Sequence, residues 1–198
     1  MGTASSSRRR SPKRPASARE RLERTAYELF SRHGIRAVGV DTIVARAGVA
    51  KMTLYKYFRS KDELVLSFLR AREELWSRAW LQAELERRGG TAADKLLAVF
   101  DVFDKWFRRH DFEACAFVKV VLEHSEREHP VHQAAVRHIA NIRSFIARLA
   151  AEAGVADPDE FARQWQILMI GSIVAAAAGD FDAARRAKGV AVRLIRQS

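Results

Sequence analysis

The segment at residues 40–58 constrains the fold more than any other part of the chain. Two short apolar runs are separated there by one glycine, Gly48. Because glycine enters the left-handed backbone region at little cost, it permits a tight turn between two helices. Ala45 and Ala47 are small enough to let those helices cross closely. The segment therefore predicts a helix-turn-helix, with the motif at about residues 39–58.

This motif has two chemically different sides. The apolar side chains that anchor it to a preceding helix are Ile43, Val49, Leu54 and Phe58. The other side of the second helix presents amines and hydroxyls, on Lys51, Thr53, Tyr55, Lys56 and Tyr57. Such groups donate to phosphates and to base edges, so we expect a recognition helix in the major groove. The alternative is a three-helix cap with only a structural role.

The rest of the chain has helical periodicity and lacks the two-residue alternation of strands. Ser17–Glu20 and Ser60–Glu63 have the pattern of a capping box, which opens a helix. Gly34 and the Gly89–Gly90 pair suit helix ends. We predict an all-α fold of about nine helices, near residues 17–33, 40–47, 50–57, 60–88, 91–109, 116–123, 130–152, 157–178 and 180–196.

The predicted organisation has three parts. Residues 1–16 form a disordered basic tail of Ser, Arg, Pro and Lys, which cannot build a packed core. Residues 17–62 form the helix-turn-helix domain, and residues 63–198 form a larger helical domain. The run Arg8–Arg10 in the tail is either an arm that touches DNA or a solvated segment, and the sequence leaves both open.

Composition indicates which partners the protein binds and in which compartment it works. Its formal net charge of +11 indicates a polyanionic partner, either nucleic acid or an anionic membrane surface. The basic N-terminus lacks the apolar stretch of a signal peptide, and the most apolar run, residues 165–178, is too short to span a bilayer. The single cysteine, Cys115, fits a reducing compartment. We expect a cytoplasmic protein with no membrane partner.

The spacing around Gly48 resembles that of the TetR family of bacterial transcriptional regulators. The match extends strictly over about thirty residues, at Gly34, Ile43, Ala47–Val49, Leu54, Tyr55, Tyr57, Phe58, Lys61 and Leu64. More loosely it covers the whole chain, including the helical layout and the final pair of helices. The resemblance implies a homodimer that binds a double-stranded DNA operator and senses a small molecule.

The resemblance also implies roles for individual residues. Bases are read from the first turn of the recognition helix, here Lys51, Met52 and Thr53. Phosphates are contacted by paired aromatics and by the lysine that opens the fourth helix. Val38 and Gly39 replace hydroxyl residues usual in the family, so Thr42 is expected to compensate. The predicted DNA-binding residues are Thr42, Lys51, Met52, Thr53, Tyr55, Lys56, Tyr57 and Lys61.

The larger domain is rich in aromatic residues at helical spacing. Ordinary core packing explains any one of them, but as a group they predict an apolar cavity for an apolar or aromatic effector. The predicted lining residues are Trp76, Phe103, Trp106, Phe107, Phe117, Val121, Trp165 and Met169.

Small residues on the last two helices predict close helix packing and a two-fold dimer, with an intramolecular core as the alternative. The predicted interface residues are Trp165, Leu168, Ser172, Ala175, Ala176, Ala187, Val190, Ala191 and Leu194.

Other chemistry has weaker support in the sequence. His124, His129, His132 and His138 lie among glutamates, but neither a cysteine cluster nor a His-Glu-x-x-His spacing supports a metal site. Cys115 is either a redox switch or a small core residue. We predict no cofactor, no metal and no catalytic residue. The predicted function is a repressor that its ligand releases from a palindromic operator. The alternatives are a non-specific architectural DNA-binding protein and a small-molecule enzyme.

Overall fold

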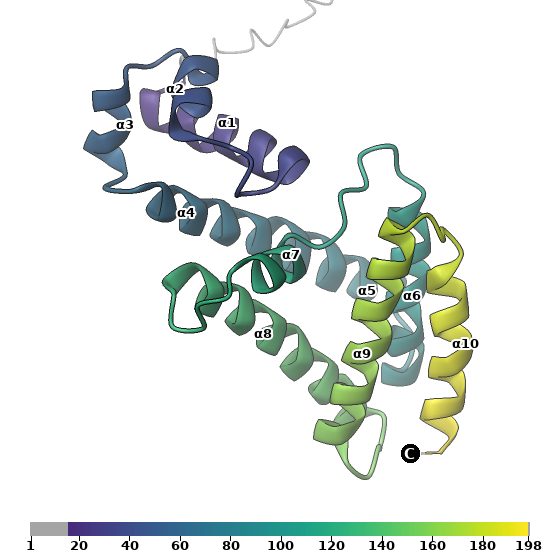
Figure 1. Cartoon of the computed structure of the whole chain (residues 1–198). Coiled ribbons are helices and arrows are strands. Elements are labelled where there is room, and N and C mark those ends of the chain that lie inside the picture. Colours follow the sequence, from purple (N-terminus) through teal and green to yellow (C-terminus); the bar gives the residue numbers. More distant parts are fainter. Residues whose placement is uncertain (1–15, 198) are drawn as a thin grey trace, which may run out of the picture.

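The computed structural model describes residues 16–197, except for the side chains of residues 76–79. Apart from Ala16, the predicted tail lies outside the described residues. Across the described part the fold is entirely helical, which confirms the all-α prediction (Figure 1). The elements are α1 (Ala18–His33), α2 (Val40–Ala47), α3 (Lys51–Tyr57), α4 (Lys61–Glu73), η1 (Glu74–Gln82), α5 (Ala83–Arg88), α6 (Ala92–Phe107), α7 (Ala116–Glu123), α8 (Pro130–Glu152), α9 (Pro158–Ala177) and α10 (Ala183–Arg196).

Side-chain caps set where several helices begin. At the start of α1, Ser17 Oγ accepts from the Glu20 amide at 3.2 Å, and Glu20 Oε2 accepts from the Ser17 amide at 2.6 Å. This is the predicted capping box. At the start of α4, Ser60 Oγ accepts from the Glu63 amide at 3.3 Å, but the Glu63 carboxylate accepts from the amide of Arg59 instead of closing the box. Both arrangements satisfy amides that the helix itself cannot bond.

The helices enclose two apolar cores. In the first, α1, α2 and α3 pack on the first half of α4 through Leu64, Val65 and Phe68, and this core continues into α7 and α8 through Phe117 and Val131. The second core lies among α5, α6, α8, α9 and α10. The packed N-terminal unit thus extends past the predicted boundary at residue 62.

A single rod links the two cores. The elements α4, η1 and α5 follow one another without a break along residues 61–88, the range that the sequence predicts as one helix. Figure 1 shows the rod running from the helices α1–α3 to the C-terminal helices. Its middle part, η1, is π-helical, with wider turns than an α-helix, and π-helical turns often occur at functional sites. Within the described residues, every helix is too short or too polar to cross a membrane.

Candidate functional site

Gly48 makes the turn between α2 and α3. Its backbone has φ 63° and ψ 43°, the left-handed conformation that the sequence requires of it. The amides of Gly48 and Val49 donate to carbonyls in the last turn of α2, at 3.3 and 3.1 Å. Leu54 and Phe58 then fix α3 on the N-terminal core, where both are buried.

The remaining side of α3 faces solvent. Met52 is 79% exposed, and Lys51, Tyr55, Lys56 and Tyr57 are also exposed. Thr53 is half-buried, and Thr42 on α2 is exposed. The structure therefore brings seven of the eight predicted DNA-binding residues to one end of the molecule, on α2 and α3 (Figure 1). Amines, hydroxyls and aromatic rings therefore gather at this end of the molecule, most of them exposed to solvent.

Lys51 is already paired in the free protein. Its Nζ lies 2.8 Å from Asp41 Oδ1, which joins α3 to α2. The hydrogen bond and the charge of Asp41 raise the pKa of Lys51, so this lysine stays cationic. Asp41 places a negative charge beside the predicted reading face, where it opposes a polyanion and competes with it for Lys51.

Replacing Asp41 with asparagine is expected to strengthen binding to every duplex, because Lys51 is released and one repulsive charge is lost. The slope of the logarithm of the DNA-binding constant against the logarithm of salt concentration should become steeper by about one unit. Titrations at several salt concentrations measure both effects. The control is Asp159→Asn, at an exposed acid on α9. Equal affinities for Asp41→Asn and wild type would place Lys51 away from the DNA.

Lys61 has a structural contact that the sequence did not reveal. Its Nζ donates to the carbonyl of Ile35 at 2.7 Å, which ties the start of α4 to the α1–α2 loop. Burial lowers the pKa of Lys61. An ammonium has three donors, so two remain beyond this bond. Its contact with a phosphate stays a prediction.

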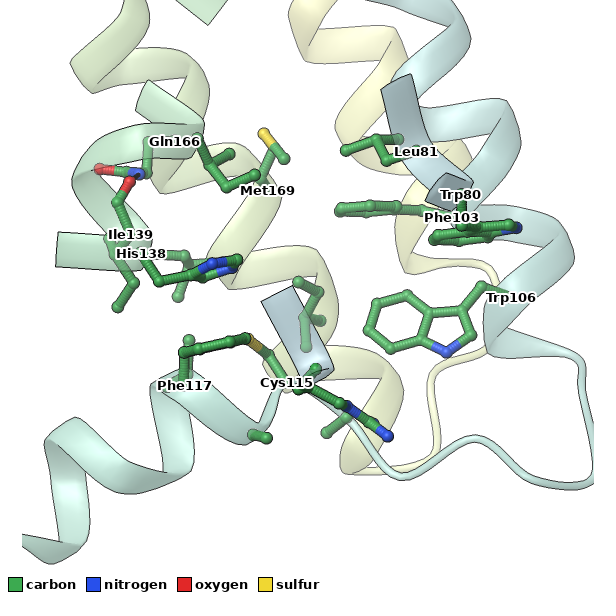
Figure 2. Close-up of a pocket in the computed structure, with 17 residues that line it drawn as sticks. Trp80, Leu81, Phe103, Trp106, Cys115, Phe117, His138, Ile139, Gln166 and Met169 are labelled. Carbon is green, nitrogen blue, oxygen red and sulfur yellow. Dashed lines mark hydrogen bonds between the residues drawn. The ribbon is translucent and has the colours of Figure 1, made fainter. Parts of the chain in front are cut away.

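An aromatic cavity of about 100 Å³ lies in the C-terminal domain, among η1, α6, α7, α8 and α9 (Figure 2). Four of the predicted lining residues are in its wall: Phe103, Trp106, Phe117 and Met169. The sequence missed Trp80 and Leu81 of η1, and a set of residues on other elements: Arg72, Ala114, Cys115, Ala116, Val118, His138, Ile139, Ile142, Gln166, Ile170 and Ile173.

The other predicted lining residues lie elsewhere. Trp165 is fully buried in the C-terminal core, where its ring stacks on Phe161 at 5.1 Å between centroids. Phe107 is also fully buried, with Phe103 and Phe112 against its ring. Val121 packs against the N-terminal core. The side chain of Trp76 lies outside the described residues. Ordinary core packing, the alternative considered above, thus holds for Trp165 and Phe107.

Burial disfavours the charged forms of two polar cavity residues. His138 stacks on Phe117 with ring centroids 3.5 Å apart, and its Nδ1 lies 3.5 Å from Glu73 Oε1 without forming a hydrogen bond. Desolvation lowers the pKa of His138 and raises the pKa of the Cys115 thiol. The uncharged forms of both groups are therefore favoured, which suits a cavity with mainly apolar walls. His138 could have been found in the sequence, because it falls on the same face of α8 as Val131 and Ala135.

The predicted dimer residues divide into two groups. Trp165, Ser172, Ala176, Ala187 and Ala191 are buried within the single protomer. They contact its own core and cannot form the surface of an interface. Leu168, Ala175 and Leu194 are partly buried against the same core, whereas Val190 is 49% exposed.

A different set of residues on α9 and the loop after it faces outward. Ile167, Val174 and Phe181 recur every seven residues and are about half exposed or more, at 70%, 51% and 49%. Gly171 and Ala178 lie on the same face and are exposed. Val190 on α10 is exposed as well, and these residues of α9, the loop after it and α10 are together called the apolar stripe below. This stripe lies on α9, the loop after it and α10 and shares only Val190 with the predicted interface residues; the interface itself stays a prediction.

Comparisons with known proteins agree with this architecture. The family model described as "Bacterial regulatory proteins, tetR family" matches residues 24–68, and that described as "Tetracyclin repressor-like, C-terminal domain" matches residues 92–190. A TetR-family transcriptional regulator of Streptomyces coelicolor is 30% identical, with 93% of this chain and 91% of that chain covered and a TM-score of 0.85.

Two further proteins are similar over most of their length. A TetR-type regulator from Streptomyces avermitilis is 26% identical, covers 92% of this chain and 98% of its own, and has a TM-score of 0.73. The transcriptional regulator YjdC of Escherichia coli is 23% identical over 85% of this chain and 90% of its own. TetR-family regulators bind DNA operators and small-molecule effectors, and they form dimers. With its helix-turn-helix, its exposed α3 and both halves matched, the chain belongs to the TetR family of DNA-binding transcriptional regulators.

Proposed function

We propose that the protein is a dimeric repressor, released from a palindromic operator when a small aromatic molecule fills the cavity among η1, α6, α7, α8 and α9. The observation that carries this proposal is the cavity itself, because it lies beside the rod that leads to the DNA-binding helices. Its walls include Trp80, Phe103, Trp106 and Phe117, which suit an aromatic body. The operator-bound form is then the ligand-free one.

The dimer is proposed to form through the stripe of Ile167, Gly171, Val174, Ala178, Phe181 and Val190. An isologous pair of such stripes would bury these residues around a two-fold axis. The two α3 helices would then contact DNA about one helical turn apart, ~34 Å, which is the geometry that reads a palindrome. The predicted contacts of Thr42, Met52, Tyr55, Lys56 and Tyr57 belong to this proposal.

The proposal contains no catalytic step, and it places the protein in the cytoplasm with its DNA target. A non-specific architectural role is the main rival. An architectural protein has no use for an internal aromatic cavity beside the linking rod, whereas an effector-controlled regulator requires one.

A variant with a filled cavity tests the proposal. The operator is first recovered by selection from random DNA, and aromatic compounds are then screened for release of the wild-type protein. Ile142→Trp places a larger ring in the cavity wall, so it should keep operator binding and lose the response to any compound that releases wild type. Thermal melting checks that the variant is folded. If the compound released Ile142→Trp from the operator at the same compound concentration as wild type, the effector site would lie elsewhere.

A further inference from the structure

Arg72 is a buried arginine that borders the aromatic cavity and two further hollows, one of them a polar crevice beside α1. It lies on α4 and is only 6% exposed. On one side it lines the aromatic cavity, and on the other it lines a polar crevice of about 310 Å³ between α1 and the segment joining α6 to α7. Within the described part of the chain, Arg72 is the one residue common to both linings. A change in the aromatic cavity therefore has a direct route to α1.

The contacts of Arg72 on the α1 side are specific. Its Nη1 donates to Tyr27 Oη and to Ser31 Oγ, each at 3.1 Å. The guanidinium also lies over the Tyr27 ring, 5.6 Å from the centroid, in cation–π geometry. Nη2 is 3.8 Å from the carboxylate of Glu113, which follows α6. Arg72 thus ties α4 to α1, the helix on which α2 and α3 pack.

The charge of the aromatic cavity indicates what kind of ligand could reach Arg72. Its described lining contains no aspartate or glutamate. The ionisable residues in it are Arg72, His138 and Cys115, and burial disfavours charge on the last two. Figure 2 shows Trp80, Phe103 and Trp106 across the cavity from His138 and Phe117. The cavity therefore combines aromatic walls with a bordering arginine that is always charged and whose guanidinium is held on the α1 side.

We propose that Arg72 couples the cavity to the DNA-binding helices, and that the effector is an aromatic compound with a planar anionic group, such as a carboxylate. This inference rests on the proposed function above and names its ligand class. A carboxylate can take two parallel hydrogen bonds from a guanidinium, which are stronger than bonds to neutral hydroxyls. It would compete with Tyr27 and Ser31 for Arg72. Once Arg72 turns to the ligand, the end of α4 loses its polar tie to α1 while the apolar contacts of Leu64, Val65 and Phe68 remain. The spacing of the two α3 helices is then held less firmly.

This mechanism meets the thermodynamic condition for allostery. The ligand binds the state in which Arg72 faces the cavity more tightly than the state in which Arg72 holds α1. DNA favours the second state, so ligand and DNA weaken each other by the same factor.

The experiment uses benzoate, phenylacetate and cinnamate, each compared with its uncharged amide. Trp80 and Trp106 are in the cavity wall, so tryptophan fluorescence reports binding. At least one carboxylate should lower the affinity of wild type for the selected operator by about tenfold or more, and its amide should not. Arg72→Met should lose this difference between carboxylate and amide. The matched control is Arg70→Met, at an exposed arginine on the same helix, which should behave as wild type.

A second variant separates coupling from binding. Tyr27→Phe combined with Ser31→Ala removes both hydroxyl partners and leaves the cavity lining unchanged. By fluorescence it should bind the carboxylate at least as tightly as wild type, because the competing hydroxyls are gone. Its operator affinity should already be low without ligand, and the carboxylate should change it far less than in wild type. This pair also keeps the test valid if Arg72→Met does not fold, which thermal melting shows.

Three results would overturn the inference: release by amides as well as by carboxylates, a wild-type response in Arg72→Met, or no binding by any of the carboxylates. Full coupling in the Tyr27→Phe, Ser31→Ala variant would overturn the route through α1. Failure of the proposed function looks different, because wild type would then show no preference for any selected DNA before ligand is added.

Discussion

Val174→Glu is expected to separate the protomers and to lower operator affinity by roughly 100-fold or more, because two linked binding sites become independent. Val174 is 51% exposed at the middle of the apolar stripe on α9. In a two-fold interface the new glutamate of one protomer would be buried near the same glutamate of the other, without a partner of opposite charge. Sedimentation and operator titration measure the two effects.

The chain offers a matched control for this substitution. Val136 on α8 is exposed to a similar extent, 44%, and lies outside the stripe. Val136→Glu should remain dimeric and bind the operator as wild type does. A dimeric Val174→Glu, or equal losses in the two variants, would show that the protomers meet through another surface.

Leu54→Ala is expected to destabilise the helix-turn-helix strongly. Leu54 is fully buried and fixes α3 on the N-terminal core, so its truncation leaves a cavity and should lower the free energy of unfolding by about 2–5 kcal/mol. Operator binding should fall with it, since α3 is no longer held. Denaturant unfolding and DNA titration provide the measurements.

Met52→Ala is the control, on the same helix and two residues away. Met52 is 79% exposed, so its loss should change stability by no more than about 0.5 kcal/mol. Its effect should fall on sequence preference instead. A large loss of stability in Met52→Ala, or none in Leu54→Ala, would contradict the assignment of the buried and reading faces of α3.

The helix-turn-helix could be predicted because its determinants are local. The conformation of Gly48 and the capping box of Ser17 and Glu20 depend only on residues a few positions away. The two faces of α3 follow from helical periodicity in the same way. For these features the sequence was sufficient, and the all-helical fold with its helix-turn-helix is confirmed.

The interior of the C-terminal domain depends on how distant helices cross, which the sequence does not show. An arginine on a helix is usually solvated, yet α1 and the segment after α6 bury Arg72 on α4. α9 has apolar residues on both sides, so periodicity alone does not show which side faces the protomer's own core. In the structure Trp165 faces the protomer's core, whereas Ile167, two residues later, faces solvent. Of the eight residues predicted to line the cavity, four are in its wall, and of the predicted interface residues only Val190 belongs to the exposed stripe.

The most direct test of the central claim, that the exposed side of α3 reads DNA, is a competition between the selected palindrome and random duplex of the same length. Wild type should prefer the palindrome by about 10³-fold or more at physiological salt. Lys51→Ala or Thr53→Ala should change which palindrome is preferred while the protein remains folded and dimeric. Equal affinity for palindrome and random duplex, or an unchanged preference in both variants, would contradict the account.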